Sequence, residues 1–304
     1  MQTSSICTAP KPLQNFGNMV AKIIDGKAVA QHVRAQCREE TAALKARGVT
    51  PGLAVIIVGD NPASKVYVAN KVKACTEVGL HSTVYAFAVD TPDAEVEAKI
   101  LALNADPLVH GILVQLPLPK HFDAKRVLAC ISVDKDVDGF HLYNVGALAQ
   151  GETVFPPCTP YGVSKMLEYE HIPIEGQNVV VVGASNIVGK PMAMMLMQRD
   201  ATVCICHAKT RDLAQFTILA DILVVAAGVP NLILPQMVRT GAVVIDVGIN
   251  RLSDGRLVGD VDFEGVRQKA SYISPVPGGV GPMTITMLVH NTIQAAQRQA
   301  ELEG

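Results

Sequence analysis

The sequence has no tryptophan, and only 4% of its 304 residues are aromatic, so it offers few side chains on which bases could stack. Its formal net charge is −2, which gives no general attraction to phosphate backbones or to anionic lipid. No apolar run approaches the roughly eighteen residues that a membrane-spanning helix needs. These absences argue against a nucleic-acid-binding protein and against a membrane protein.

Cysteine is present without a framework. The seven cysteines stand singly except for Cys204 and Cys206, and this pair matches no zinc or redox spacing. We therefore predict no metal site and reduced thiols, as in a cytoplasmic protein. The first residues, MQTSSICTAPKPLQNFGN, lack the continuous apolar segment of a secretory signal. Residues 1–18 are predicted to be a flexible extension, and the folded chain is expected from residue 19.

Apolar residues make up 49% of the chain and charged residues 18%, which is typical of a large buried core, and the length suits about two domains. Apolar runs expected for strands buried on both faces of a parallel sheet occur at 53–59, 84–89, 111–118, 178–183, 201–206, 221–228 and 241–248. Helical patterns separate them at 26–46, 62–78, 93–104, 159–170, 190–199 and 284–303. The alternation predicts an α/β fold with right-handed crossovers.

The elements form two groups. The prolines of PPCTP (156–160) cannot continue a central strand, so they indicate a stiff connection between domains. We predict a substrate-binding catalytic domain at 19–155 and a Rossmann-type dinucleotide-binding domain with a parallel sheet at 156–283. The last helix, 284–304, follows the Gly/Pro-rich SPVPGGVGP and is expected to return to the first domain. Two such lobes imply a cleft between them.

The stretch GDNPASKVYVANKVKAC predicts a helix in the first lobe. Asn61 suits its N-cap, and Gly79 suits the residue just beyond its end. Ser64, Tyr67 and Lys71 then share one stripe of the helix surface. The spacing of the tyrosine and the lysine is either that of an ordinary surface pair or that of a catalytic pair.

The stretch NVVVVGASNIVGKP predicts a strand, a tight turn between Gly183 and Gly189, and a helix. Backbone amides at such a helix start bind pyrophosphate. An NAD site usually has an acidic residue at the end of the following strand, but this strand ends in His207, Lys209 and Arg211. The basic residues favour the 2′-phosphate of NADP.

The order of the two motifs excludes one interpretation of the pair. Short-chain dehydrogenases use a Tyr-x-x-x-Lys pair that follows their glycine-rich turn, whereas here the pair precedes the turn and lies in the other lobe. The acidic DKDVDG (134–139) resembles the start of a calcium loop, but Val145 stands where a bidentate Glu is required. Its carboxylates are either a solvated turn or include one that grips an amidine-like ligand.

Seven stretches together resemble the bifunctional methylenetetrahydrofolate dehydrogenase/methenyltetrahydrofolate cyclohydrolase family. They are VGDNPASKVYVANKVKAC, GILVQLPLPKHF, DKDVDGFHLYNVG, PPCTPYGV, GASNIVGKPM, GAVVIDVGIN and PVPGGVGPMTITMLVHNT. The resemblance covers roughly residues 20–298. It implies an enzyme of one-carbon metabolism and purine biosynthesis, usually a homodimer. Such an enzyme oxidises 5,10-methylenetetrahydrofolate with NADP and hydrolyses the methenyl product to 10-formyltetrahydrofolate.

Carried over residue by residue, the resemblance implies roles for particular positions. Lys71 is the expected catalytic lysine, Tyr67 its partner, Gln115 the contact of the lysine, and Asp138 the carboxylate that grips the pterin. The expected substrate pocket adds Ser64, Pro277, Gly278 and Gly279. The expected cofactor-binding residues are Gly183, Ala184, Ser185, Ile187, Val188, Lys190, His207, Lys209, Ile249 and Thr286.

Two positions depart from the common family pattern. Ala184 stands where many members have Arg, and Ala208 where many have Ser, and both of those residues often contact the 2′-phosphate. We expect Lys190, Lys209 and Arg211 to replace them. Two alternatives stay open: an NAD-dependent dehydrogenase with weak cyclohydrolase activity, and a non-catalytic nucleotide-binding protein. The presence of Lys71, Gln115 and Asp138 argues against the latter.

Overall fold

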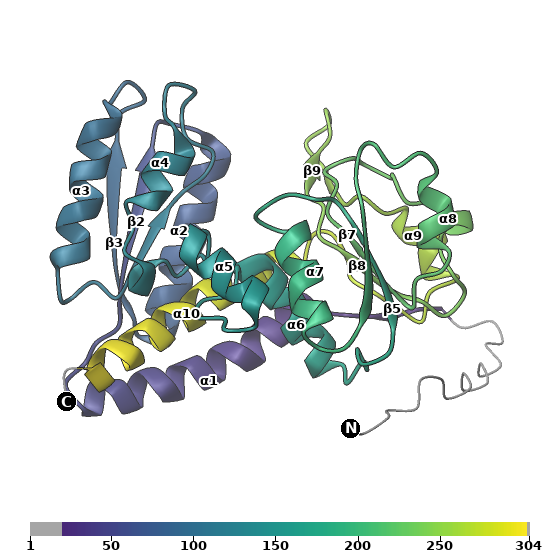
Figure 1. Ribbon diagram of the computed structural model, residues 1–304, viewed down its shortest axis with the longest axis horizontal. Coiled ribbons are helices and arrows are strands. Elements are labelled where there is room, and N and C mark those ends of the chain that lie inside the picture. The colour runs from purple at the N-terminus through teal and green to yellow at the C-terminus, as the bar shows by residue number, and fades with distance from the viewer. Residues whose placement is uncertain (1–19, 303–304) are drawn as a thin grey trace, which may run out of the picture.

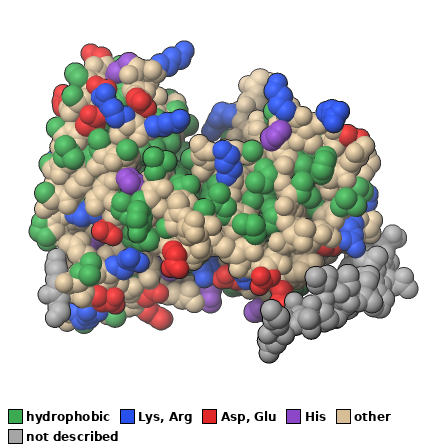
Figure 2. Space-filling model, in the orientation of Figure 1, with side chains coloured by type: hydrophobic (Ala, Val, Ile, Leu, Met, Phe, Trp, Pro, Cys, Tyr) green, Lys and Arg blue, Asp and Glu red, His purple; other side chains and the backbone are tan. Residues whose placement is uncertain are grey.

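The chain folds into two α/β lobes that lie side by side (Figure 1). The computed structural model describes residues 20–302, so the predicted extension at 1–18 lies outside the described residues. The surface is hollowed between the lobes (Figure 2). No helix within residues 20–302 is long and apolar enough to cross a membrane.

The first lobe is built on a three-stranded parallel sheet in the order β3 (His81–Phe87), β2 (Gly52–Val58), β4 (Gly111–Val114). Every residue of β2 is buried, as expected for a central strand covered on both faces. Its alternate residues enter two different apolar clusters. Ala54, Ile56 and Val58 pack with α3 (Asp93–Ala105) and α4 (Ala124–Ala129). Leu53, Val55 and Ile57 belong to the cluster that includes α1 (Gly26–Ala46), α2 (Pro62–Val78) and α10 (Val280–Leu302).

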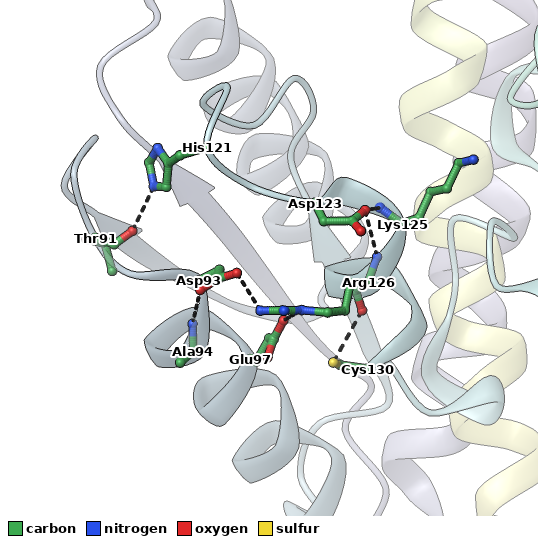
Figure 3. Close-up of polar contacts among 9 residues, drawn as sticks. All are labelled: Thr91, Asp93, Ala94, Glu97, His121, Asp123, Lys125, Arg126 and Cys130. Atoms are coloured by element: carbon green, nitrogen blue, oxygen red, sulfur yellow. Dashed lines mark hydrogen bonds and ion pairs between the residues drawn. The ribbon is translucent and has the colours of Figure 1, made fainter.

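Helix α4 was not predicted from the sequence, and polar contacts with α3 hold it in place (Figure 3). Asp123 caps the helix by accepting from the backbone N–H groups of Lys125 and Arg126. The Arg126 guanidinium donates to Glu97 at 2.6 Å and also to Asp93. Because these partners come from α3, the short helix depends on a tertiary contact rather than on its own six residues.

The second lobe contains a six-stranded parallel sheet. Its order is β1 (Lys22–Ile23), β11 (Tyr272–Ile273), β8 (Val243–Asp246), β7 (Ile222–Val225), β5 (Asn178–Val182), β6 (Thr202–Cys206). From β5 the chain passes to β6 on one side and then to β7 on the other side. This reversal places a crevice for a dinucleotide at the carboxyl end of β5, and the predicted α/β fold with a Rossmann-type parallel sheet is confirmed.

Outside the first sheet's layers and apart from the two long helices α1 and α10, the helices span at most twelve residues each. They are η1 (Val133–Lys135), α5 (Leu142–Gln150), α6 (Cys158–Tyr169), α7 (Gly189–Met197), α8 (Leu213–Thr217), η2 (Pro235–Met237) and α9 (Phe263–Arg267), and a small hairpin pairs β9 (Asn250–Arg251) with β10 (Leu257–Val258). Helix α5 was not predicted from the sequence.

Two long helices join the lobes. Helices α1 (Gly26–Ala46) and α10 (Val280–Leu302) run side by side along the base of the first lobe, as the purple and yellow ribbons show (Figure 1). Helix α10 also packs on α2 (Pro62–Val78) and α6. The predicted return of the last helix to the first lobe is confirmed. The helix begins at Val280 rather than at 284, because Pro282 lies in the first turn, where the N–H that proline lacks would have no acceptor within the helix.

The predicted division at residue 19 is wrong in one respect. Residues 22–23 form β1, which pairs in parallel with β11 at the edge of the second sheet. The described part of the chain therefore begins in the second lobe and crosses to the first lobe with α1. A two-residue strand carries too little periodicity to be predicted from its own sequence. The other predicted domain boundaries stay predictions.

Candidate active site

Helix α2 presents the predicted stripe at the edge of the first lobe. Asn61 caps the helix by accepting from the N–H groups of Ala63 and Ser64, and Gly79 ends it with a φ of 84°, so both predicted ends are confirmed. Ser64 is buried, Lys71 is half-buried, and Tyr67 keeps 39% of its surface exposed. Along the stripe, Ser64 is therefore the least accessible side chain and Tyr67 the most accessible.

Lys71 is held by the predicted glutamine. Its Nζ donates to Oε1 of Gln115 at 2.9 Å. Gln115 directly follows β4, and its backbone N–H still donates to the Ile56 carbonyl oxygen at 2.8 Å. The Gln115 Nε2 donates to the Leu116 carbonyl oxygen at 2.6 Å, which orients the side-chain amide with its oxygen toward the lysine. The partner of the amine is thus an uncharged acceptor.

Burial and opposite charges act against each other at Lys71 and Asp138. Burial lowers the pKa of Lys71, and the Asp138 carboxylate partly opposes this shift. Burial likewise raises the pKa of Asp138, and Lys71 opposes that shift. Burial therefore displaces both groups toward their neutral forms, and the attraction between them limits each shift.

The acidic segment resolves into three carboxylates with different surroundings. Asp134 is exposed, whereas Asp136 is buried and accepts from the N–H of His141 and the side chain of Asn144, both at 2.8 Å. Asp136 therefore serves the local fold. Asp138 is half-buried beside Lys71, so it is the carboxylate of this segment that is placed to act on a ligand.

Two residues that sequence reasoning missed fix the position of Asp138. Asn291 of α10 donates through Nδ2 to the carbonyl oxygens of Val137 at 2.8 Å and of Pro156 at 3.0 Å. The Cys158 thiol donates to the Val137 carbonyl oxygen at 3.4 Å and also hydrogen-bonds Asp138. Burial raises the pKa of Cys158 well above its usual value, so this sulfur stays a thiol. No spacing rule in the sequence connects these distant positions.

A cleft of about 770 Å³ adjoins this cluster. One wall is helix α2 with Tyr67, and the other is the loop with Pro277, Gly278 and Gly279, together with Ile249. Predicted substrate and cofactor positions meet here, and polar side chains of α1 and α2, among them Arg34, Asn70 and Lys73, also line the cleft. Ser64, Lys71, Gln115 and Asp138 lie behind this lining rather than in it. Tyr67 connects the two parts, because it lines the cleft and lies one helical turn from Lys71.

The predicted nucleotide turn is formed by close backbone approaches. Gly183 has a φ of 119°, and a Cβ added there would lie 2.1 Å from the Ala226 carbonyl oxygen. A Cβ on Gly189 would lie 1.9 Å from the Gly183 carbonyl oxygen. The Ser185 Oγ accepts from the N–H of Val188 at 3.1 Å, so this side chain shapes the start of α7. Both glycines are required by the turn itself.

The exposed positions of the turn are Ser185, Asn186, Ile187 and Lys190. Ile187 is 43% exposed, Ala184 is half-buried, and the Lys190 ammonium donates to Asn186 Oδ1 at 2.7 Å. Thr286 differs from the other predicted cofactor residues, because it is fully buried in α10 and its hydroxyl donates to the Pro282 carbonyl oxygen. Its side chain is therefore committed to the helix.

The end of β6 lies beside the turn, because β5 and β6 pair in register from Asn178–Thr202 to Val182–Cys206. His207, Lys209 and Arg211 follow, and all three are exposed. The His207 N–H donates to Thr210 Oγ1 at 2.9 Å, and the Lys209 N–H donates to His207 Nδ1 at 3.2 Å. This tight turn places a basic segment directly after the carboxyl end of β6, and the first acidic residue after it is Asp212.

The geometry defines a class of protein: a two-lobed α/β enzyme with a dinucleotide crevice in one lobe and a lysine–glutamine–aspartate cluster in the other. Family models agree. Residues 24–138 match the tetrahydrofolate dehydrogenase/cyclohydrolase catalytic domain, and residues 157–300 match the NAD(P)-binding domain of that family.

Individual relatives cover nearly the whole chain. The chain is 64% identical over 287 residues to the bifunctional protein FolD of Nitrosospira multiformis, covering 94% of this chain and 100% of the relative. It is similar to the crystal structure of bifunctional FolD from Campylobacter jejuni, with a TM-score of 0.90 and 52% identity over 91% of this chain and 99% of that one. A Trypanosoma brucei FolD, complexed with NADP cofactor and inhibitor, has a TM-score of 0.89 and 39% identity over 92% and 98% of the two chains.

The chain therefore belongs to the tetrahydrofolate dehydrogenase/cyclohydrolase family. The resemblance predicted from its sequence motifs is confirmed, and so is the prediction of a bifunctional enzyme of one-carbon folate metabolism. The alternative of a non-catalytic nucleotide-binding protein is set aside.

Proposed function

We propose that this enzyme oxidises 5,10-methylenetetrahydrofolate with NADP and then hydrolyses the methenyl cation to 10-formyltetrahydrofolate, with Lys71 as the base. The observation that carries the proposal is the 2.9 Å hydrogen bond from Lys71 to the uncharged Gln115. A half-buried amine with such a partner loses a proton more easily than a solvated one. The positive charge of the methenyl substrate would favour the neutral amine further.

Lys71 would act on the water that attacks the cationic carbon. A neutral amine accepts a proton from this water as the C–O bond forms, and the proton can then pass to the leaving nitrogen of the opening ring. Gln115 holds the amine in place without adding a negative charge that would keep it protonated. The lysine thus gains position from its partner without losing basicity.

Asp138 would bind the 2-amino-4-oxopterin edge. A carboxylate accepts two hydrogen bonds from neighbouring N–H groups of such a ring, and this fixes the orientation of the ring. Lys71 favours the ionised form of Asp138 against the effect of burial. Tyr67 is exposed to the cleft and can stack on the benzoyl ring of the substrate, with Ser64, Pro277, Gly278 and Gly279 shaping the pocket around it.

NADP is the cofactor we propose, bound at the turn of Gly183 and along the basic segment after β6. Hydride acceptance is the chemistry that the bound cofactor supplies. Exposed Lys209 and Arg211 fit a 2′-phosphate, which carries about two negative charges near neutral pH. Lys190, in the first turn of α7, is the third expected cation. The NADP-bound relative from Trypanosoma brucei supports this choice.

NAD is the second candidate, because Ala184 and Ala208 remove two contacts that are common in the family. An absorbance assay with 5,10-methylenetetrahydrofolate, run separately with NADP and NAD, distinguishes the two. We expect kcat/KM to favour NADP by about tenfold or more, since one charge-assisted contact is worth roughly 1.5–3 kcal/mol. Equal or better kcat/KM with NAD would replace this proposal by the second candidate.

Two variants locate the source of this preference. Lys209→Ala and Arg211→Ala should each lower the preference for NADP and leave catalysis with NAD nearly unchanged. Arg256→Ala is the matched control, because Arg256 is an exposed arginine of the same lobe whose partner is Asp254. A preference that is unaffected by both variants would show that the basic segment does not contact the cofactor.

A homodimer in the cytoplasm is the remaining part of the proposal. Strand β6 lies at the edge of the large sheet, and an apolar groove of about 410 Å³ runs beside it, lined in part by Val203, Phe216 and Leu219. An open sheet edge flanked by apolar side chains suits pairing with a second copy. The six cysteines of the described residues are free thiols, which suits a reducing compartment. Sedimentation as a monomer at micromolar concentration would contradict the dimer.

A further inference from the structure

The second lobe contains a fully buried carboxylate for which the proposed chemistry has no role. Asp260 has no exposed surface. Its Oδ2 accepts from the backbone N–H groups of Ala227 at 2.7 Å and Gly228 at 2.8 Å. Its Oδ1 accepts from the Val229 N–H at 2.9 Å and from the Asn250 side chain at 2.8 Å. Four donors take up the acceptor sites that a carboxylate offers.

These donors come from two different loops at one edge of the sheet. Residues 227–229 follow β7, and Asn250 follows β8 by four residues. Strands β5, β7 and β8 are neighbours in parallel, so both loops lie at the carboxyl edge where dinucleotides bind in such folds. Ala226 also contacts the glycine turn, because its carbonyl oxygen is the atom that excludes a side chain at Gly183.

A second buried carboxylate, Asp246, binds the backbone around Asp260. Asp246 at the end of β8 accepts from the backbone N–H groups of Asp260 and Gly248 through Oδ1, both at 3.0 Å, and from that of Val261 through Oδ2, also at 3.0 Å. The position of Asp260 is therefore fixed by the sheet itself. Asp260 in turn binds both the loop after β7 and Asn250, the first residue of β9.

We propose that Asp260 is a positioning residue for the dehydrogenase reaction. It holds the loop 226–229 and the loop 248–250 at the spacing that the nicotinamide half of the cofactor requires, without touching the cofactor. This inference rests on the proposed use of a nicotinamide cofactor. It goes beyond that proposal in assigning a role to a residue outside the crevice.

The use of the three N–H groups explains why a carboxylate is required. Three successive backbone N–H groups converge on one side chain, and an amide would direct its own NH₂ group against at least one of them. Because Asp260 occupies these N–H groups, this loop leaves none of them for a phosphate. The pyrophosphate is then left to the turn of Gly183, and the loop 226–229 to the other half of the cofactor.

The experiment compares Asp260→Asn with Asp262→Asn. The control removes the same charge two residues later, from a side chain that caps α9 by accepting from the Gly265 N–H and does not contact either loop. We measure the KM for NADP, the melting temperature, and the hydrolysis of methenyltetrahydrofolate without any cofactor. For Asp260→Asn we expect the KM for NADP to rise at least about tenfold, the size of one lost charged hydrogen bond. Hydrolysis should stay within about twofold of the unmodified enzyme.

Three results would overturn the inference. They are an unchanged KM for NADP, an equal rise in the Asp262→Asn control, and a parallel loss of both activities with a lowered melting temperature. If Asp260→Asn does not fold, Asn250→Ala decides, because it removes one donor from the same carboxylate; its KM for NADP should rise and its cofactor-free hydrolysis should not change. An unmodified enzyme that reduces neither NADP nor NAD would instead refute the proposed function.

Discussion

Each lobe buries ionisable side chains, and the two lobes treat them differently. In the second lobe, Asp246 and Asp260 each accept at least three hydrogen bonds, nearly all from backbone N–H groups. In the first lobe, the Lys71 ammonium has a single side-chain acceptor, Gln115, and Asp138 is paired with a thiol. The fully bonded pair fixes loops, whereas the sparsely bonded pair keeps bonding capacity for a substrate. Many backbone donors thus mark the structural carboxylates, and the sparse bonding of Asp138 supports the substrate-binding role proposed for it.

The largest effect is expected at the lysine. Lys71→Met should lower cyclohydrolase activity by roughly 10²–10⁴-fold, the usual contribution of a general base, because no other amine of α2 contacts Gln115 among the described residues. Folate and NADP binding should persist. Lys65→Met on the same helix is the control, since Lys65 pairs with Asp60 instead. Near-normal hydrolysis by Lys71→Met in an absorbance assay would end the assignment.

The next effect concerns the carboxylates of the acidic segment. Asp138→Ala should weaken folate binding by roughly 2–3 kcal/mol, about a 30- to 150-fold rise in Kd. Asp134→Ala removes the same group from an exposed position four residues earlier and should leave Kd unchanged. Fluorescence or calorimetric titration measures both values. Equal affinities for the two variants would show that Asp138 does not bind the pterin.

A smaller effect sharpens the role of the neutral partner. Gln115→Glu would place a negative charge at 2.9 Å from the Lys71 amine and so raise its pKa, by about one unit or more. The limb of the cyclohydrolase pH profile in which the rate rises with pH should move to higher pH by the same amount, and the rate at pH 7 should fall. Gln115→Met, which adds no charge, should not move the profile to higher pH. A profile that is unmoved by the glutamate would place the base elsewhere.

The smallest effect is one of stability in the second lobe. Burial raises the pKa of Asp246 from 3.8 to about 6, so the folded state binds a proton that the unfolded state has already lost. The contribution of this group to the free energy of unfolding is greatest below pH 3.8. It declines as pH rises toward 6 and is constant above that value.

Asp246→Asn isolates this contribution, because the amide resembles the protonated acid and does not titrate. Denaturant unfolding of both proteins between pH 7 and pH 4 gives the difference in free energy. That difference should shift in favour of the unmodified protein as pH falls below about 6. A difference that is independent of pH would show that the hydrogen bonds keep Asp246 ionised throughout.

Much of the framework could be predicted from local sequence. Helix α2 begins and ends where Asn61 and Gly79 predict, because caps act within one turn. The predicted strands lie within a few residues of the observed ones, although β4 ends at Val114, well before the predicted 118. Beyond this point Pro117 has no N–H for the ladder. Strands β3 and β6 are partly exposed rather than buried on both faces, because each lies at the edge of its sheet. The periodicity of apolar residues predicted the alternating strands and helices, and the motifs predicted the residues of the site.

The parts that could not be predicted depend on distant partners. Helix α4 depends on Arg126 and its acceptors in α3, and β1 depends on β11 at the opposite end of the chain. Cys158 and Asn291 are unremarkable in sequence, and their meaning comes from contacts with the segment around Val137. Neither composition nor spacing encodes a contact between residues so far apart.

Asn291 also has a consequence for synthesis of the chain. The carbonyl groups that flank Asp138 are tied by a side chain of α10, and α10 covers one face of the first sheet. While a ribosome is still making the second lobe, the first lobe lacks this helix and exposes apolar surface. We therefore expect the nascent first lobe to be a substrate for chaperones, and the proposed pterin pocket to form only after residues 280–302 have left the exit tunnel.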